Sequence, residues 1–203
     1  MGAEFVLGKG AVQDAAARPA TLSLADRFDT VLDDSAMIGG AGEYLTRPGF
    51  WHGAIGVSAV WAGGLRGLFE LHLARWKRRD EHSLAHLASA YAATRATHAT
   101  LVAAAVEIDA DPTEYAVAEA RARSVRHTIE RLCTTALDDL GVGAGPEPLA
   151  HDAAIIERTQ QLQLYIRQCH GERDLAPLGR HLRDARAAAQ ADDAIGHGGG
   201  PGS

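Results

Sequence analysis

The sequence predicts an all-α protein: an antiparallel bundle of four to five helices, preceded by a short irregular or β segment. Apolar residues recur every three or four positions through most of the chain after residue 46. Breaks rich in Gly, Pro and Asp interrupt this pattern. They leave stretches of roughly 20 to 30 residues, and helices of that length joined by short loops are typical of a bundle. Hydrophobic residues make up 46% of the chain, which is enough for one core.

Three parts are expected along the chain. Residues 1–45 form an irregular N-terminal segment, in which Phe28, Val31 and Leu32 suit a weak strand before a glycine-rich break. Residues 46–192 form the helical bundle. Residues 193–203 are rich in glycine and are expected to form a disordered, linker-like tail.

Local signals place the helix ends. Pro48 marks the first start, because proline is tolerated in the first turn, and Asp80 is expected to cap the second helix. Asp111 and Pro112 stop that second helix, and the glycines of the segment 141–145 are expected to end the third. The five helices are therefore expected at about 48–79, 80–109, 113–140, 149–170 and 172–192.

Charge, hydropathy and the two cysteines limit the classes of function that the sequence predicts. The net charge is -6, with acids and bases interspersed, so the concentrated basic face that nucleic-acid binding needs is missing. No stretch is long and apolar enough for a membrane span, and we expect a cytoplasmic protein. Cys133 and Cys169 both lie in helical contexts, which favours a pair of intracellular thiols over a disulfide or a metal site.

The first helix is unusually rich in glycine. Each glycine in a helix interior costs about 1 kcal/mol relative to alanine. One interpretation is close approach of a neighbouring helix, a subunit or a cofactor to bare backbone, and the other is an irregular helix packed by its aromatic residues. We favour close packing, with ligand contact second. The glycines are Gly49, Gly53, Gly56, Gly63, Gly64 and Gly67.

Other candidate constellations are less specific. His82 and His86 share a helix face, but no third ligand stands at a suitable spacing, so no metal site is assigned. The basic run that includes Arg75, Lys77 and Arg78 suits a phosphate, although cations at a helix C-terminus are also favoured by the macrodipole. The glycines of 141–145 would let a pyrophosphate approach the backbone, but they follow a helix rather than a strand.

Read in order, several segments resemble the C-terminal helical domain of the acyl-CoA dehydrogenase family. The resemblance covers roughly residues 28 to 178, and helix order is shared with related flavin monooxygenases. The matching segments are Asp33-Asp34, Arg47-Pro48-Gly49-Phe50-Trp51-His52-Gly53, Ala62-Gly63-Gly64-Leu65, the glycine turn 141–145, and Pro148-Leu149 followed by His151-Asp152.

This resemblance implies an FAD-dependent oxidoreductase that removes a proton from the α carbon and a hydride from the β carbon of an acyl thioester. It implies flavin contacts at Lys77 or Arg78 and at Gly143 and Gly145 of the glycine turn. The glutamine that the family places one turn into the second helix is Ala88 here. The resemblance also implies that the bundle contacts other subunits, as a homo- or hetero-oligomer.

The resemblance leaves the catalytic base unassigned. The family's proton-abstracting glutamate belongs near the end of the fourth helix, where this chain carries residues 165–170 without a carboxylate. The alternative family position near Trp51 and His52 also lacks one. His170 and Glu172 are the nearest candidates for a base. Of the family's N-terminal helical domain and β-barrel domain, at most a strand remnant in residues 1–45 is expected here, so we expect a site that is incomplete or needs a partner chain.

Three functions are therefore carried forward. The first is an acyl-CoA dehydrogenase-like flavoprotein that takes an acyl-CoA-type molecule. The second is a non-catalytic helical assembly module, which the missing carboxylates and the glycine-rich helix favour. The third is a relative of the flavin-dependent monooxygenases, suggested by the position of His170.

Overall fold

The computed structural model describes residues 5–7, 26–28, 39–40 and 42–197. It confirms the all-α fold class, with six α-helices in the described part of the chain. Strands β1 (Phe5–Leu7) and β2 (Asp26–Phe28) pair antiparallel. Of the strand expected around Phe28, Val31 and Leu32, only Phe28 lies in β2, and the other two residues lie outside the described ranges.

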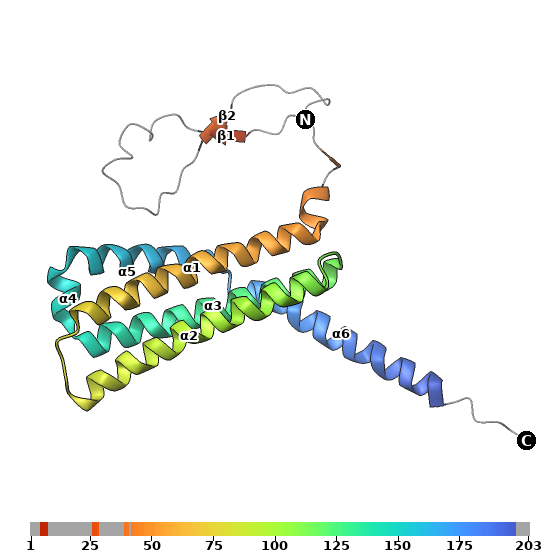
Figure 1. Cartoon of the computed structure of the whole chain (residues 1–203). Coiled ribbons are helices and arrows are strands. Elements are labelled where there is room, and N and C mark those ends of the chain that lie inside the picture. Colours follow the sequence, from red (N-terminus) through yellow and green to blue (C-terminus); the bar gives the residue numbers. More distant parts are fainter. Residues whose placement is uncertain (1–4, 8–25, 29–38, 41, 198–203) are drawn as a thin grey trace, which may run out of the picture.

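Helices α1, α2, α3 and α5 lie side by side and run alternately up and down (Figure 1). The short helix α4 connects α3 to α5 at one end of the bundle, and the far half of α6 projects away from it. A 3-10 turn, η3 (Glu43–Thr46), leads into the first helix. The helices are α1 (Pro48–Arg75), α2 (Glu81–Ala110), α3 (Tyr115–Ala144), α4 (Pro146–His151), α5 (Ala153–Ile166) and α6 (Glu172–His197).

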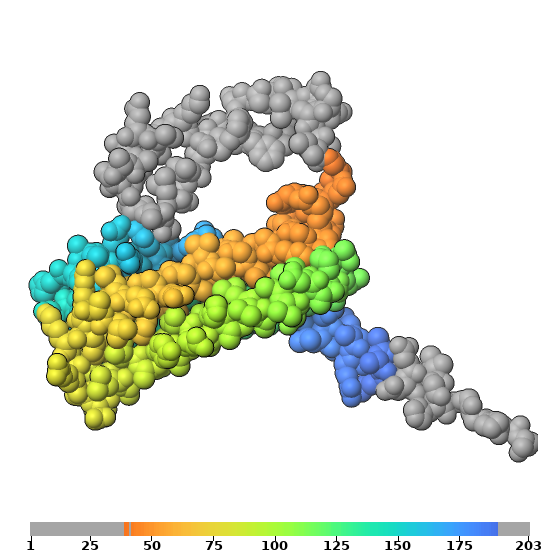
Figure 2. Space-filling view, in the orientation of Figure 1, coloured from red at the N-terminus to blue at the C-terminus, as the bar shows by residue number. Residues whose placement is uncertain are grey.

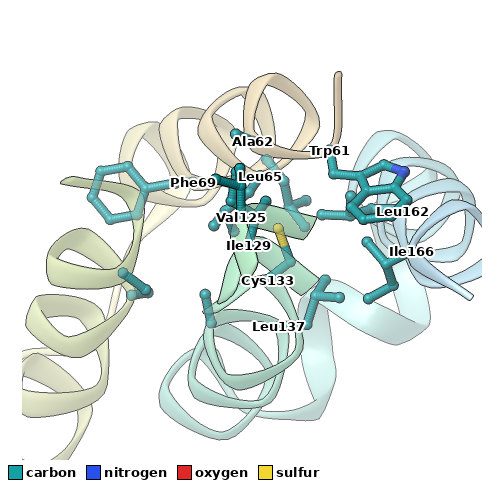
Figure 3. Close-up of a cluster of buried hydrophobic side chains, with 14 of the residues drawn as sticks. Trp61, Ala62, Leu65, Phe69, Val125, Ile129, Cys133, Leu137, Leu162 and Ile166 are labelled. Atoms are coloured by element: carbon teal, nitrogen blue, oxygen red, sulfur yellow. The ribbon is translucent and has the colours of Figure 1, made fainter. Parts of the chain in front are cut away.

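The core lies between α1, α2, α3 and α5 (Figure 3). Trp61 and Leu65 of α1 are fully buried, as are Ile129 and Cys133 of α3 and Ile166 of α5. Complete burial of a Leu or Ile side chain stabilises the folded state by about 1.5–3 kcal/mol. The three- and four-residue spacing of these positions is the pattern that predicted the helices.

Arg126 of α3 ties the bundle together through its guanidinium group. Its Cζ atom lies 4.8 Å from the centroid of the Trp61 ring. Its Nη1 donates to the carbonyl oxygen of Ala54 at 2.9 Å, and its Nη2 donates to that of Gln168 at 3.4 Å. One side chain therefore joins α1, α3 and the turn between α5 and α6.

The first helix ends at Arg75, earlier than the predicted residue 79. Trp76 has extended backbone angles, and its ring turns inward against α3. Lys77 and Arg78 therefore lie in the segment between α1 and α2. The macrodipole explanation for the basic run applies only to His72 and Arg75, which are in the last helical turn.

The predicted loop of glycines is partly helical. Helix α3 continues through Gly141 and Gly143 to Ala144, and only Gly145 lies beyond its end, with a φ of 79° that favours glycine. The helix passes through Gly143 because the side chains of Trp76, which follows α1, and of His86 in α2 pack against its bare backbone. The prediction that the helix ends near Leu140 is wrong for this reason.

The predicted fourth helix is divided in two at Asp152. This residue is extended, and its carboxylate accepts hydrogen bonds from the backbone N–H groups of Ala154 and Ile155, which makes it the N-cap of α5. Helix α5 ends at Ile166 rather than at residue 170. Helix α6 continues to His197, so residues 193–197 of the expected tail are helical, while 198–203 lie outside the described residues.

Candidate functional site

A pocket of about 600 Å³ opens at the end of the bundle where α1 ends and α5 begins. This volume falls within the range of small-molecule sites. One wall is formed by the end of α1 and the segment that follows it, from His72 to Arg78. The other wall is formed by residues from Ala144 to Ile155, including Glu147, His151 and Asp152. We call it the end pocket.

The chain reversal after α1 brings the basic residues to the end pocket. The Trp76 ring packs against Gly143 of α3, and the carbonyl oxygen of Gly143 accepts a hydrogen bond from Ser83 Oγ at 2.8 Å. Asp80 caps α2 as predicted, because its carboxylate accepts from the backbone N–H of Ser83 at 2.9 Å. These contacts fix both ends of the short segment that carries Lys77 and Arg78.

The three cations of the pocket are all ion-paired. Arg75 contacts Asp152, and Lys77 Nζ lies 3.2 Å from Glu147 Oε1. Arg78 Nε lies 3.2 Å from Asp80 Oδ2. The hydrogen bond from Arg75 lowers the pKa of Asp152, and the backbone N–H groups at the start of α5 act in the same direction.

His72 is a pocket residue that sequence reasoning missed. It is only 2% exposed, and burial lowers its pKa below 6.5, while the nearby Asp152 carboxylate acts in the opposite direction. Its imidazole is therefore neutral at pH 7. His72 also lines a second pocket of about 320 Å³ whose walls include Leu68, Leu137 and Leu140. His72 follows Leu68 by four residues and therefore shares the inward face of α1. This spacing is the feature of the sequence that could have predicted its burial.

The structure brings together some of the residues predicted for a cofactor. Lys77 and Arg78 line the end pocket, and a Cβ at Gly145 would lie 3.3 Å from Arg78 Nη1. The N–H of Gly145 already donates to the carbonyl oxygen of Gly141 at 3.1 Å. Gly143 faces Trp76 and His86 instead, so its role in this structure is helix packing.

The candidate bases lie elsewhere. His170 is exposed in the turn after α5, where its backbone N–H donates to Asp174 Oδ2 at 3.3 Å and its ring Nδ1 lies 3.8 Å from the same oxygen. Glu172 is exposed at the first position of α6. Neither residue lines the end pocket.

The paired histidines of α2 have separate surroundings. Nδ1 of His86 lies 2.8 Å from Asp139 Oδ1, and Ser89 Oγ donates to Asp139 Oδ2 at 2.6 Å. His82 is exposed. Across the ranges that the structure describes, no three His, Cys, Asp or Glu side chains are grouped to hold a metal ion.

The two cysteines are free thiols. Cys133 is fully buried in α3, and burial raises its pKa to about 12. Cys169 is partly buried after α5, and desolvation raises its pKa as well. Neither thiol is activated as a nucleophile at neutral pH.

Most glycines of α1 face outward. Among the residues in the described ranges, no atom would lie within 4 Å of a Cβ added at Gly49, Gly53, Gly56 or Gly63. Only Gly64 has a tight neighbour, because a Cβ there would lie 3.3 Å from Leu162 Cδ1. Packing among the described residues therefore accounts for Gly64 but not for Gly49, Gly53, Gly56 and Gly63.

Comparison of the chain with protein-family models, with curated proteins and with solved structures gave no match. In the described part of the chain, none of the helices has the length and apolar character needed to cross a membrane.

Proposed function

We propose that this chain is an acyl-CoA dehydrogenase-like helical bundle whose end pocket binds the phosphate-bearing part of FAD. The observation that carries the proposal is the convergence of Arg75, Lys77 and Arg78 on one pocket of small-molecule size. Lys77 and Arg78 are also the residues to which the resemblance assigns flavin contacts.

The residues of the end pocket fit a phosphate group. Guanidinium and ammonium groups form strong, charge-assisted hydrogen bonds to phosphate oxygens. The Glu147 side chain that pairs with Lys77 is 67% exposed, and an exposed ion pair of this kind contributes only about 0–1 kcal/mol. Displacing Glu147 from Lys77 therefore costs little free energy.

FAD, when bound, supplies the acceptor for a hydride from the β carbon of an acyl thioester. In this chain, Lys77 and Arg78 would neutralise the phosphates, and the pair of Arg75 with Asp152 holds the start of α5 at the pocket wall. Glu147 and Asp152, the carboxylates that line the pocket, are both ion-paired, so we assign no proton-abstracting base to them. We therefore propose that this chain binds FAD and that a partner chain supplies the proton-abstracting base.

Titration of the purified protein with FAD, followed by the quenching of flavin fluorescence, tests this proposal. We expect saturable binding, with Kd weakened roughly tenfold in Lys77→Ala and in Arg78→Ala. Arg95→Ala is the control, because Arg95 is exposed on α2 and does not line the pocket. Absence of binding at about 1 mM FAD, or equal losses in all three variants, would refute the proposal.

A second candidate is a non-catalytic assembly module, and the exposed glycines of α1 favour it. A glycine-rich helix is unfavourable unless something approaches its bare backbone, and none of the residues that the structure describes does so at Gly49, Gly53, Gly56 or Gly63. Sedimentation velocity over a wide concentration range tests the minimum claim. A protein that stays monomeric at the highest concentration contradicts an assembly role.

A further inference from the structure

The second pocket, of about 320 Å³, is lined by residues of α1, α3, α4 and α5, and we call it the side pocket. Its volume is near the lower limit of small-molecule sites. It lies toward the end of the bundle where the last turns of α1 (yellow in Figure 2) meet α4 and the start of α5 (cyan). His72 is the one residue that lines both this pocket and the end pocket.

The interior of the side pocket is apolar. Leu68 of α1 and Leu137 and Leu140 of α3 line it and are buried. Val142 and Leu149 line it as well, but both are exposed and therefore belong to its rim. A hydrocarbon group that entered the pocket would remove this apolar surface, and its own, from water.

Thr159 of α5 supplies an unsatisfied polar group to the side pocket. Its hydroxyl oxygen is buried and has no hydrogen-bond partner among the described residues. Threonine hydroxyls in helices commonly donate to a carbonyl of the preceding turn, as Thr94, Thr97 and Thr100 do in α2, each at 2.9 Å. A buried hydroxyl without a partner is unfavourable. A ligand that provides the missing partner is therefore stabilised at this position.

His72 supplies a second polar group, and it is uncharged. The residue is 2% exposed, and burial lowers its pKa below 6.5, so the imidazole is neutral at pH 7. A neutral imidazole has one N–H donor and one acceptor nitrogen, and a threonine hydroxyl also donates and accepts. A ligand hydroxyl group can form hydrogen bonds of both kinds.

The charge of the side pocket differs from that of the end pocket. Arg75, Lys77 and Arg78 line the end pocket, whereas the only ionisable residues among those that line the side pocket are His72 and Asp138. Asp138 is exposed, so its carboxylate belongs to the rim, where it repels anions. Burying a charged group of either sign against apolar walls costs free energy. The side pocket therefore favours a neutral ligand.

We propose that the side pocket binds a small neutral molecule with an apolar ring or short hydrocarbon body and a single hydroxyl group, which forms a hydrogen bond with Thr159. The apolar body would contact the buried leucines of α1 and α3. This site is different from the one proposed for FAD, and its occupation does not depend on FAD binding.

Two-dimensional NMR of the isotope-labelled full chain tests the proposal with p-cresol as the probe. Toluene, which lacks the hydroxyl group, measures the contribution of the apolar body alone, and the anion p-toluate tests the exclusion of charge. We expect p-cresol to shift the amide signals of His72, Leu140 and Thr159 saturably, with a Kd at or below about 1 mM. We expect p-toluate to leave these signals unchanged.

A matched set of variants tests the role of the hydroxyl group. Thr159→Val keeps the shape of the side chain and removes the unpartnered hydroxyl, so the bundle should fold, which circular dichroism verifies. We expect this variant to bind p-cresol about tenfold more weakly and to bind toluene as the parent chain does. Thr159→Ser should restore the affinity for p-cresol. Thr94→Val is the control, because Thr94 lies in α2 and does not line the side pocket.

Three results would overturn the proposal. The first is the absence of saturable shifts with p-cresol up to about 5 mM. The second is an equal change in the affinities for p-cresol and toluene in Thr159→Val, which would exclude recognition of the hydroxyl group. The third is a set of shifts confined to Lys77, Arg78 and their neighbours, which would place the probe in the end pocket. Failure of FAD to bind would overturn only the function proposed for the end pocket.

Discussion

The indole ring of Trp76 packs against the bare backbone of Gly143, where a Cβ would lie 2.8 Å from the ring carbon Cη2. The same Cβ would lie 2.8 Å from the Cβ of His86. Three helices therefore meet at one glycine: the end of α1, the start of α2 and the end of α3. This contact turns the chain after Arg75 and directs Lys77 and Arg78 to the end pocket.

The first prediction concerns this glycine. We expect Gly143→Ala to lower the free energy of unfolding by about 1–3 kcal/mol, although alanine is the better helix former, because the added methyl overlaps two neighbours. Gly141→Ala is the matched control in the same helix, since a Cβ there lies 3.7 Å from Leu149 Cδ1, an ordinary contact. It should be neutral or should stabilise by up to about 1 kcal/mol. Urea denaturation measures both.

If Gly143→Ala is as stable as Gly141→Ala, the close packing of Trp76 on α3 does not limit stability. In that case the position of Lys77 and Arg78 would not depend on this glycine.

The second prediction concerns the thiols. Cys133 is fully buried with a pKa raised to about 12, so it should react with iodoacetamide at pH 8 only when the protein unfolds. Cys169 is partly buried, and local opening should expose it sooner. Mass spectrometry of timed samples should find alkylated Cys169 well before alkylated Cys133. Equal rates at the two sites would contradict the burial of Cys133 in the core.

The third prediction concerns pH. The pKa of His72 is lower in the folded protein than its ordinary value of 6.5, so the unfolded chain binds this proton more readily. The His72 contribution to stability is therefore complete above pH 6.5 and is lost as the pH falls from that value toward the folded pKa. We expect the free energy of unfolding to decrease across this interval in the parent chain.

The His72→Gln variant isolates this effect, because glutamine does not titrate. We expect His72→Gln to be less stable than the parent chain at pH 7, because the packing of the imidazole is lost. Between pH 7 and pH 5, however, its free energy of unfolding should decrease by less than that of the parent chain. Denaturant curves at a series of pH values provide the comparison. An identical pH dependence would exclude His72 as the source.

The fourth prediction separates the two roles of Asp152. Its carboxylate caps α5 and pairs with Arg75. Asp152→Asn retains the capping oxygen and loses the ion pair, whereas Asp152→Ala loses both, so thermal denaturation should find the alanine variant less stable. Because the pKa of Asp152 is lowered, its contribution holds above pH 3.8 and disappears as the pH falls through the folded pKa. Equal stability of the two variants would show that capping contributes nothing.

Local chemistry in the sequence determined the helical class and several helix ends. Pro48 starts α1 and the Asp80 carboxylate caps α2, because each acts on backbone within a few residues of itself. The break at Asp111 follows for the same reason. The basic pair Lys77 and Arg78 was also identified from sequence, since its charge is visible without a fold.

Only the tertiary structure decided the features that depend on distant contacts. Gly143 is helical because Trp76 and His86 pack on it, and the chain breaks at Asp152, whose carboxylate both caps α5 and pairs with Arg75. The burial of His72 depends on the pocket walls that α4 and α5 supply. These partners lie tens of residues away, so local periodicity does not report them. The glycines of α1 are visible in the sequence by itself, but only the packed bundle showed which of them contact no neighbouring helix.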